Sequence, residues 1–327
     1  MKGFRSFATI RVIVSLLISG LVLWGSYKGM EAVEKRAAIA KREALQTRNI
    51  AEKKAIPVTN GKYTDISENF IPEESLTDKP KGWVFARSII IPMAYELDER
   101  FLGWRPNDIF GLSDNRANFQ EGVLEVTRKT VAILKEKITY TDETQEYDAH
   151  LAQALDGLMI DPKRYWFPAP ESRYRDALDA LNGFMKKLEN KELIFDAGSR
   201  NLLLLLDTFE ELISACDENL VKAMEDGNVP VRQSRADDYF YYAKGISSAM
   251  GTILEGIRTD FNVTLALRAN RELLQKAIDA CHRAADISPM VVTESSLNGV
   301  LANHRANMAA PVSQARYYIS KLVKAFS

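Results

Sequence analysis

Residues 237–265 read DDYFYYAKGISSAMGTILEGIRTDFNVTL, and this stretch decides the fold class. Apolar residues recur in it at every third or fourth position, which is the repeat of one face of an α-helix. The positions are Tyr239, Ala243, Ile246, Met250, Ile253, Ile257, Phe261 and Leu265. We predict one long helix over residues 235–267, and its apolar face has to pack against other helices. An antiparallel multi-helix bundle is the simplest arrangement that achieves this.

The rest of the chain shows the same helical repeat and no alternating strand pattern. Only 17 glycines and 11 prolines interrupt 327 residues, so we expect few and long elements. A helix is predicted from Gly82, and Pro92 is expected to open a second one. After a loop at 103–118, the other predicted helices span residues 118–138, 143–159, 171–189, 192–225, 270–287 and 295–326. The fold class is therefore all-α, with a helical domain over residues 81–327.

An uncharged segment near the N-terminus predicts a membrane anchor. No charge occurs from Val12 to Tyr27, a run slightly shorter than the ~20 residues that usually cross a bilayer. The side chains of Arg11 and Lys28 can reach the two interfaces, so we predict a transmembrane helix at residues 12–28. A cleaved signal peptide is the alternative, although WGSYKGMEAV is a poor cleavage site.

The distribution of charge predicts the orientation and excludes one class of partner. Residues 1–11 contain three basic and no acidic residues, so this tail is predicted to be cytoplasmic and the bulk of the chain periplasmic, in a bacterial inner membrane. Residues 1–56 hold 11 basic and 4 acidic residues, whereas the remainder holds 32 basic and 40 acidic ones. An acidic body without a basic cluster argues against binding to nucleic acid.

Two further segments connect the predicted anchor to the helical domain. Residues 29–56 are rich in helix-forming residues, and small residues recur there at alternating spacings of four and three. This heptad pattern predicts a helical stalk, which either pairs with a second copy as a homodimer or stays a solvated spacer. Residues 57–80 contain turn-forming residues without a helical repeat and are predicted to be a linker.

The two cysteines, Cys216 and Cys281, lie among apolar residues of predicted helices. We expect both to be buried and unpaired, since a buried thiol behaves as a small apolar group. A disulfide between the two helices is the alternative in an oxidising compartment. The spacing matches neither a redox CxxC motif nor a zinc site.

His304 in NGVLANHRANMAAPV (298–312) is the most conspicuous polar candidate. It falls on the apolar stripe of the last predicted helix, in phase with Leu301 and Met308. We interpret it as a structural polar contact in the core, with a ligand or partner contact, or catalysis or metal binding, as alternatives. Pro311 cannot donate a backbone hydrogen bond, so a kink or break of the helix is expected there.

The other two histidines are weaker candidates. Asp279, His282 and Asp286 share one helix face and could hold a metal ion, although a surface Asp–His pair is the more common result of such spacing. Glu146 and His150 are one helical turn apart and carry less weight. We therefore predict no metal site.

Aromatic residues outside the core stripes are the candidate partner or ligand contacts. In the loop GWRPNDIF (103–110), Trp104 and Phe110 either dock the loop onto the bundle or offer an apolar contact. Asn107 and Asp108 suit a turn or a helix cap.

Two more aromatic stretches raise the same alternatives. Trp166 lies in YWFPAPESRY (165–174), where three aromatics and two prolines precede a helix start. Tyr241 belongs to four consecutive aromatic residues at 239–242, which cannot all be buried in one helix. Both are therefore candidate contacts.

Several segments, taken together, are typical of one family. TDKPKGW, PNDIF, FQEGVLEVTR, WFPAPESRY, FYYAKG and GVLANHRANM occur in this order. Over most of residues 75–325 the chain resembles a bacterial family of single-span membrane proteins known only as a domain of unknown function, DUF2333. The resemblance implies an inner-membrane anchor with a helical body, and it implies no activity.

No catalytic, cofactor or metal motif stands out in the sequence. GxSxG, P-loop, HExxH and GxGxxG patterns are missing, and no carboxylate pair is marked for acid–base chemistry. We expect no cofactor and interpret the chain as a non-enzymatic scaffold or assembly factor that binds proteins of the cell envelope. The alternatives are an envelope enzyme, such as a cell-wall or lipid hydrolase with unrecognised carboxylates, and a periplasmic ligand-binding module.

Overall fold

The computed structural model describes residues 79–100, 103–107, 114–140, 148–165, 168–225, 227–289 and 303–327. These residues are mostly helical, which confirms the predicted all-α class. The predicted tail at 1–11, anchor at 12–28, stalk at 29–56 and most of the linker at 57–80 lie outside the described residues. Among the helices that are described, none is long and apolar enough to cross a membrane.

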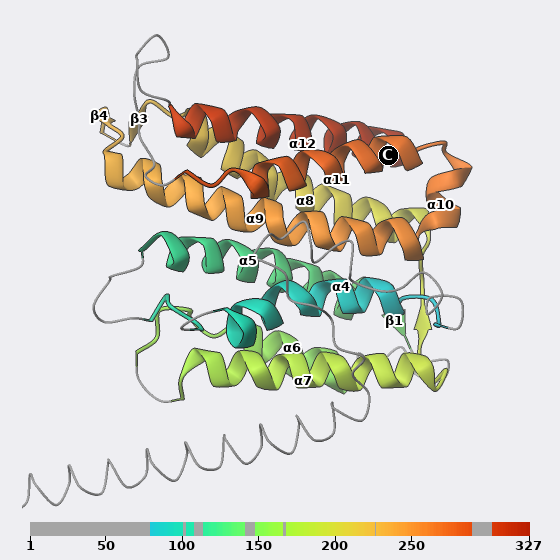
Figure 1. Ribbon diagram of the computed structural model, residues 1–327. Coiled ribbons are helices and arrows are strands. Elements are labelled where there is room, and N and C mark those ends of the chain that lie inside the picture. Colours follow the sequence, from blue (N-terminus) through green and yellow to red (C-terminus); the bar gives the residue numbers. More distant parts are fainter. Residues whose placement is uncertain are drawn as a thin grey trace, which may run out of the picture. The chain divides into compact units, whose positions relative to one another are not determined.

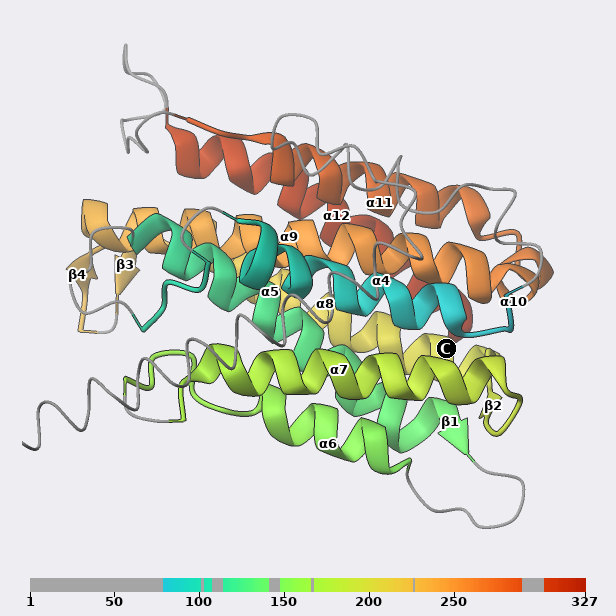
Figure 2. The same cartoon turned by 60° about the horizontal axis from the view of Figure 1, so that its bottom comes forward.

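The helices form an antiparallel bundle in two consecutive sets, which Figures 1 and 2 show from two directions. The first set comprises α4 (Trp83–Ala94), the π-helix η1 (Tyr95–Glu99), α5 (Asp114–Ile133), the π-helix η2 (Leu134–Ile138), α6 (Ala149–Leu158) and α7 (Pro170–Glu189). The second comprises α8 (Ser199–Val221), α9 (Gln233–Asp260), α10 (Asn262–Leu267), α11 (Arg271–Asp286) and α12 (His304–Phe326). Helix α9 packs against α4, α5, α8, α11 and α12, so it lies at the centre of the core.

Four two-residue strands, which the sequence pattern did not predict, join helix ends. Strand β1 (Thr139–Tyr140) pairs antiparallel with β2 (Ile194–Phe195), with Thr139 opposite Phe195. Strand β3 (Met224–Glu225) pairs antiparallel with β4 (Val229–Pro230), and this hairpin connects α8 to α9. Strands of this length are too short to show an alternating pattern in the sequence.

Several helix boundaries differ from the prediction. Pro92 does not open a new helix but lies buried within the last turn of α4, and the chain continues directly into the π-helix η1. The long helix predicted at 235–267 is interrupted at Phe261, which separates α9 from α10. The last helix begins at His304 and continues through Pro311, so the break that we expected at this proline is wrong.

Helices α5 and α9 cross with their backbones in close contact. A Cβ atom added to Gly122 would collide with the backbone of Tyr242 and Ile246, and one added to Gly245 would collide with the carbonyl of Phe119. The two glycines therefore let the helix backbones touch where any side chain would separate them. This crossing joins the first set of helices to the second.

Two more glycines of α9 allow helices α11 and α4 to pack closely against it. A Cβ atom on Gly251 would lie 3.3 Å from the Cβ of Cys281 on α11, and one on Gly256 would collide with Ser88 of α4. At its end, Asp260 is buried and accepts a hydrogen bond of 2.7 Å from the backbone N–H of Phe85. No side chain of α4 itself caps the start of this helix, so the Asp260 carboxylate provides the acceptor for a free backbone N–H in its first turn.

Both cysteines are free and buried, as predicted. Burial raises the pKa of Cys216 and of Cys281 to about 12. The thiols therefore stay protonated and unreactive at neutral pH.

The glycine crossing generates a stability prediction. Gly245→Ala should lower the free energy of unfolding by about 2–3 kcal/mol, because the new methyl group meets rigid backbone and forces the helices apart. Gly183→Ala is the matched control, since a Cβ atom there meets only the imidazole of His150, which can rotate toward solvent. This control should change stability by less than about 1 kcal/mol. Urea unfolding followed by circular dichroism measures both, and equal losses would contradict the role of the crossing.

Candidate functional site

The connections with the most polar contacts gather at one end of the bundle, where α5, α7, α9 and α12 begin (Figure 1). We call this the hairpin end. It contains η1, the loop at 103–107, the connection between α6 and α7, and the β3–β4 hairpin. Four of the sequence-predicted candidates with described positions lie here: Trp104, Asn107, Tyr241 and His304.

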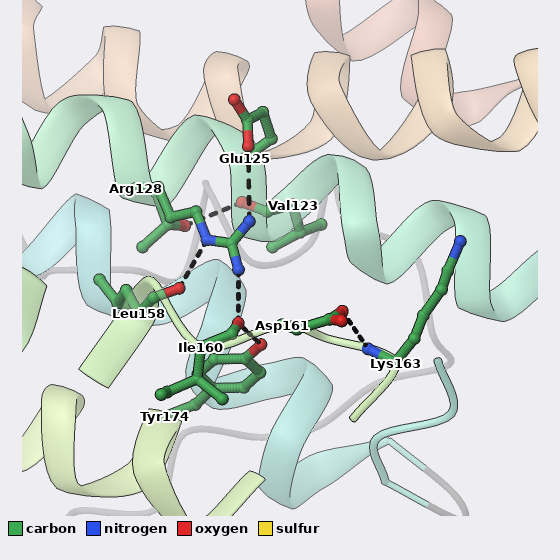
Figure 3. Close-up of polar contacts among 9 residues, drawn as sticks. Val123, Glu125, Arg128, Leu158, Ile160, Asp161, Lys163 and Tyr174 are labelled. Carbon is green, nitrogen blue, oxygen red and sulfur yellow. Dashed lines mark hydrogen bonds and ion pairs between the residues drawn. The ribbon is translucent and has the colours of Figure 1, made fainter. Parts of the chain in front are cut away.

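Arg128 of α5 fixes the connection between α6 and α7 (Figure 3). Its Nε donates to the carbonyl of Leu158 at 2.5 Å, and its Nη2 donates to the carbonyl of Ile160 at 2.6 Å. The Tyr174 hydroxyl donates to the same Ile160 carbonyl at 2.7 Å, and the Glu125 carboxylate lies 3.7 Å from Nη1. The carbonyl groups at the end of α6 have no hydrogen-bond donor within the helix, and Arg128 provides the missing donors.

Trp104 docks its loop onto this connection. Its indole is buried, its Nε1 donates to the carbonyl of Pro162 at 3.2 Å, and its ring contacts Tyr174 edge-to-face at 5.0 Å. The side chain of Asn107 donates to Glu171 at the start of α7, at 3.1 Å. Of the two alternatives for Trp104, the structure therefore shows docking, and the indole is covered.

A buried carboxylate holds the other side of the same loop. Glu96 is fully buried in η1, its Oε2 lies 2.6 Å from Nε of Arg100, and it accepts a hydrogen bond of 3.0 Å from Gln120. Gln120 also donates to the carbonyl of Gly103 and accepts from the N–H of Arg105. The π-helical turn places the carboxylate inward, so one charged pair orders both the end of α4 and the loop.

The described part of the chain contains four fully or nearly buried carboxylates, and each one connects two segments. Glu96 and Asp260 act as described above. Asp148 caps the first turn of α6 and forms an ion pair of 2.7 Å with Lys187 of α7. Asp217 of α8 accepts hydrogen bonds from Ser313 and from Arg316 of α12, the latter at 2.9 Å. These acids are cross-links of the bundle, and their hydrogen-bonding capacity is used structurally.

Titratable groups that are half-buried or buried also lie between α5 and its neighbours. Burial raises the pKa of Glu121, and the ammonium of Lys163, 3.1 Å away, opposes this shift. Burial likewise raises the pKa of Tyr174 and of Tyr242 well above the usual tyrosine range. Both phenols therefore remain neutral donors at physiological pH, which suits the hydrogen bond from Tyr174 to the backbone.

The histidines are placed in different surroundings from those predicted. His304 is the first residue of α12 and is half-buried. The helix begins there because Asn303 caps it by accepting a hydrogen bond from the N–H of Ala306 at 2.9 Å. The predicted core position is wrong for this reason, since the buried stripe of α12 runs on from Met308.

His282 does not share a ligand set with the two aspartates of its own helix. Its Nε2 lies 2.9 Å from the Glu255 carboxylate on α9, while Asp279 accepts from Gln275. His150 lies 3.6 Å from Asp148, and Glu146 is outside the described residues. No group of three or more His, Cys, Asp or Glu side chains in the described ranges is arranged to hold a metal ion.

Of the remaining aromatic candidates, Tyr241 lies within the described residues. Tyr241 is half-buried against Phe240, with ring centroids 5.1 Å apart, and it is hydrogen-bonded with Asn115. Asp108, Phe110 and Trp166 lie outside the described residues, so their contacts stay predictions.

The hairpin end also carries a surface feature that the sequence analysis missed. A hollow of about 410 Å³ lies between the hairpin and the start of α9. It is lined by Glu225, Val229, Pro230, Arg232, Ser234, Arg235 and Asp238. Glu225 accepts hydrogen bonds from Lys222 at 2.7 Å and Tyr239 at 2.8 Å, so the hairpin is fixed to α9. Two arginines and two acids lie in this lining, and exposed Arg235 is 3.6 Å from the carboxylate of Asp238, so the hollow is lined by charges of both signs.

The fold and its hairpin end define a class of protein, an all-α bundle domain whose loops are tied down by buried ion pairs. The chain belongs to the family described as an uncharacterized protein conserved in bacteria, DUF2333, whose family model matches residues 60–237 and 213–326. This confirms the resemblance seen in the sequence segments. No curated protein and no solved structure matches the chain.

Lys244 of α9 yields a prediction of pH dependence. Its Nζ donates to the carbonyl of Ile287 at 2.8 Å and to Ser288 at 2.6 Å, where α11 has just ended. Burial, with a smaller contribution from the charge of Arg100, lowers the pKa of Lys244 from 10.5 to about 8. In this pH interval the unfolded chain binds more protons than the folded one, so the free energy of unfolding should rise with pH through it.

Lys244→Met should flatten this rise, whereas Lys129→Met, a change at an exposed lysine of α5, should leave it intact. Urea unfolding at several pH values across the interval measures the slopes. Identical slopes in the wild type and Lys244→Met would contradict the shifted titration of this lysine.

Proposed function

We propose that this protein is a single-span protein of the bacterial inner membrane whose helical domain binds other proteins in the periplasm, as a scaffold or assembly factor of the envelope. Protein binding is supported by one observation above all, the large apolar side chains that are exposed on the β3–β4 hairpin and at the end of α8 just before it. Val221, Met224 and Val229 expose 65%, 46% and 46% of their surface there.

The membrane part of the proposal rests on the sequence. The uncharged run at 12–28 and the basic residues before it favour an anchor with a cytoplasmic N-terminus. The heptad pattern at 29–56 favours pairing of two copies through the stalk. On this proposal the described domain is tethered to the periplasmic face of the membrane.

The surface at the hairpin end has the chemistry of a protein contact. Its apolar side chains are held by a hairpin whose position is fixed by Glu225, so they are presented without the entropy cost of ordering a free loop. Exposed apolar side chains with arginines close by are typical of protein interfaces. A partner segment with apolar side chains and charges of both signs would complement these features.

The buried carboxylates favour a scaffold over an envelope enzyme. A general acid or base needs an accessible carboxyl group whose hydrogen-bonding capacity is turned toward a substrate. Glu96, Asp148, Asp217 and Asp260 instead hold helices and loops together.

Photo-crosslinking in cells tests the proposed partner surface. A photoreactive amino acid at Met224 or Val229 should yield a discrete covalent product with an envelope protein, because both side chains are exposed at the proposed contact. The same amino acid at Tyr317 of α12, which is 57% exposed, is the matched control and should yield none.

A second change makes this test specific. Val229→Asp should abolish the product formed at Met224, since a charge on the same hairpin opposes an apolar contact while leaving the exposed hairpin folded. Equal products at Met224 and Tyr317, or a product at Met224 that survives Val229→Asp, would overturn the proposed surface.

A further inference from the structure

The opposite end of the domain carries a second exposed apolar surface, on the short helix α10. Val263 and Leu267 are one helical turn apart, so they share a face, and they expose 58% and 80% of their surface. Leu267 is the most exposed large apolar side chain among the described residues. Two residues fix α10 to the bundle, because Leu265 is buried and Thr264 hydrogen-bonds to the carbonyl of Ala197. The helix thus holds two apolar side chains outward on a rigid base.

Basic side chains surround this apolar pair. Between residues 258 and 271 the chain carries three exposed arginines, Arg258, Arg268 and Arg271. The one acidic residue in that interval, Asp260, is buried beneath the first turn of α4 and contributes nothing to the surface. Arg268 also reaches the last helix, where it donates to the carbonyl of Ala325 at 2.8 Å. Directly after this interval, exposed Glu272 forms an ion pair with Lys276, so the exposed charges from 258 to 276 remain mostly basic although the body as a whole is acidic.

The chain enters the described domain at the same end. Phe85, in the first turn of α4, contacts Phe261 at 5.9 Å between ring centroids, directly before α10 begins. The residues that precede α4 include the uncharged run at 12–28, which we propose to be the anchor. A linker over residues 57–80 would reach about 80 Å when extended. This length would allow any face of the domain to contact the lipid, so the choice depends on the surface itself.

We infer that the α10 surface docks onto an anionic phospholipid bilayer, with Val263 and Leu267 inserted at the interface and the three arginines near the headgroups. This inference rests on the proposed membrane anchor and deepens it. Apolar side chains flanked by basic ones are the pattern of interfacial membrane contacts. Each arginine near an anionic surface favours partitioning roughly fivefold.

A weak contact is sufficient in this arrangement. An anchored domain is confined close to its own membrane, at an effective concentration in the millimolar range. Two apolar side chains and three arginines therefore suffice to orient it, although they would not recruit a free protein tightly. With the α10 end on the bilayer, the hairpin end points away from the membrane, toward a partner in the periplasm.

The test uses the full chain in lipid nanodiscs and an environment-sensitive fluorophore on Leu267→Cys. The native cysteines are buried and do not compete for the label. In discs with about one third phosphatidylglycerol, the emission should shift to the blue and be quenched by lipid-attached quenchers. Val229→Cys, at the hairpin end, is the matched control and should show neither change. Arg271→Glu should reduce the effect at Leu267→Cys several-fold, while a glutamate in the first turn of α11 is compatible with its helix dipole.

Three results would overturn the inference. The label at Leu267→Cys could behave like the label at Val229→Cys, or it could respond equally in discs of phosphatidylcholine alone. It could also respond to protein concentration and not to lipid, which would mean that a second copy covers α10. A chain that is not retained in the discs would contradict the anchor instead. In that case, the fluorescence of the same label after addition of anionic vesicles tests separately whether the α10 surface binds lipid.

Discussion

The crossing of α5 and α9 at Gly122 and Gly245 is the constraint on which the rest of the structure depends. Two backbones in direct contact bring the first set of helices against the second at a fixed point. The other glycines of α9 then set the depth at which α4 and α11 pack. Because interiors are close-packed, these positions leave little freedom for the apolar stripes to shift. The single core of this domain follows from that geometry.

Buried ion pairs supply what the apolar core does not, which is order at the helix ends. A buried carboxylate is costly unless each of its oxygens finds a partner, so it specifies its surroundings strongly. Through Gln120, Glu96 fixes the loop at 103–107, and Asp217 of α8 binds the side chain of Arg316 on α12. At the other end of the bundle, Asp260 caps α4 beside α10. Each end presents exposed apolar side chains with arginines close by. We connect these surfaces with two different contacts, a protein at the hairpin and lipid at α10.

The sequence predicts the long helices better than their ends. The stripe through Ile246, Ile253 and Ile257 identifies α9, and its repeat requires no knowledge of the neighbours. The interruption at Phe261 depends on Asp260 reaching α4, a contact that local periodicity does not contain. The repeat also misplaces His304 in the core, because the cap at Asn303, where α12 begins, is a local feature that the repeat does not contain. The spacing of glycines in α9 was the available signal for the close crossings, whereas the α10 surface appears only once the burial of neighbouring side chains is known.

Both proposed contacts require the described domain to be outside the cytoplasm and attached to the membrane. The most direct measurement is the activity of a reporter that functions only in the periplasm, fused after Ser327, together with the fractionation of the fusion. Our account predicts an active reporter that stays with the membrane after an alkaline wash. Without residues 12–28, the fusion should be neither exported nor membrane-bound, so its reporter should be inactive. An inactive reporter, combined with activity of a cytoplasmic reporter at the same position, would contradict it.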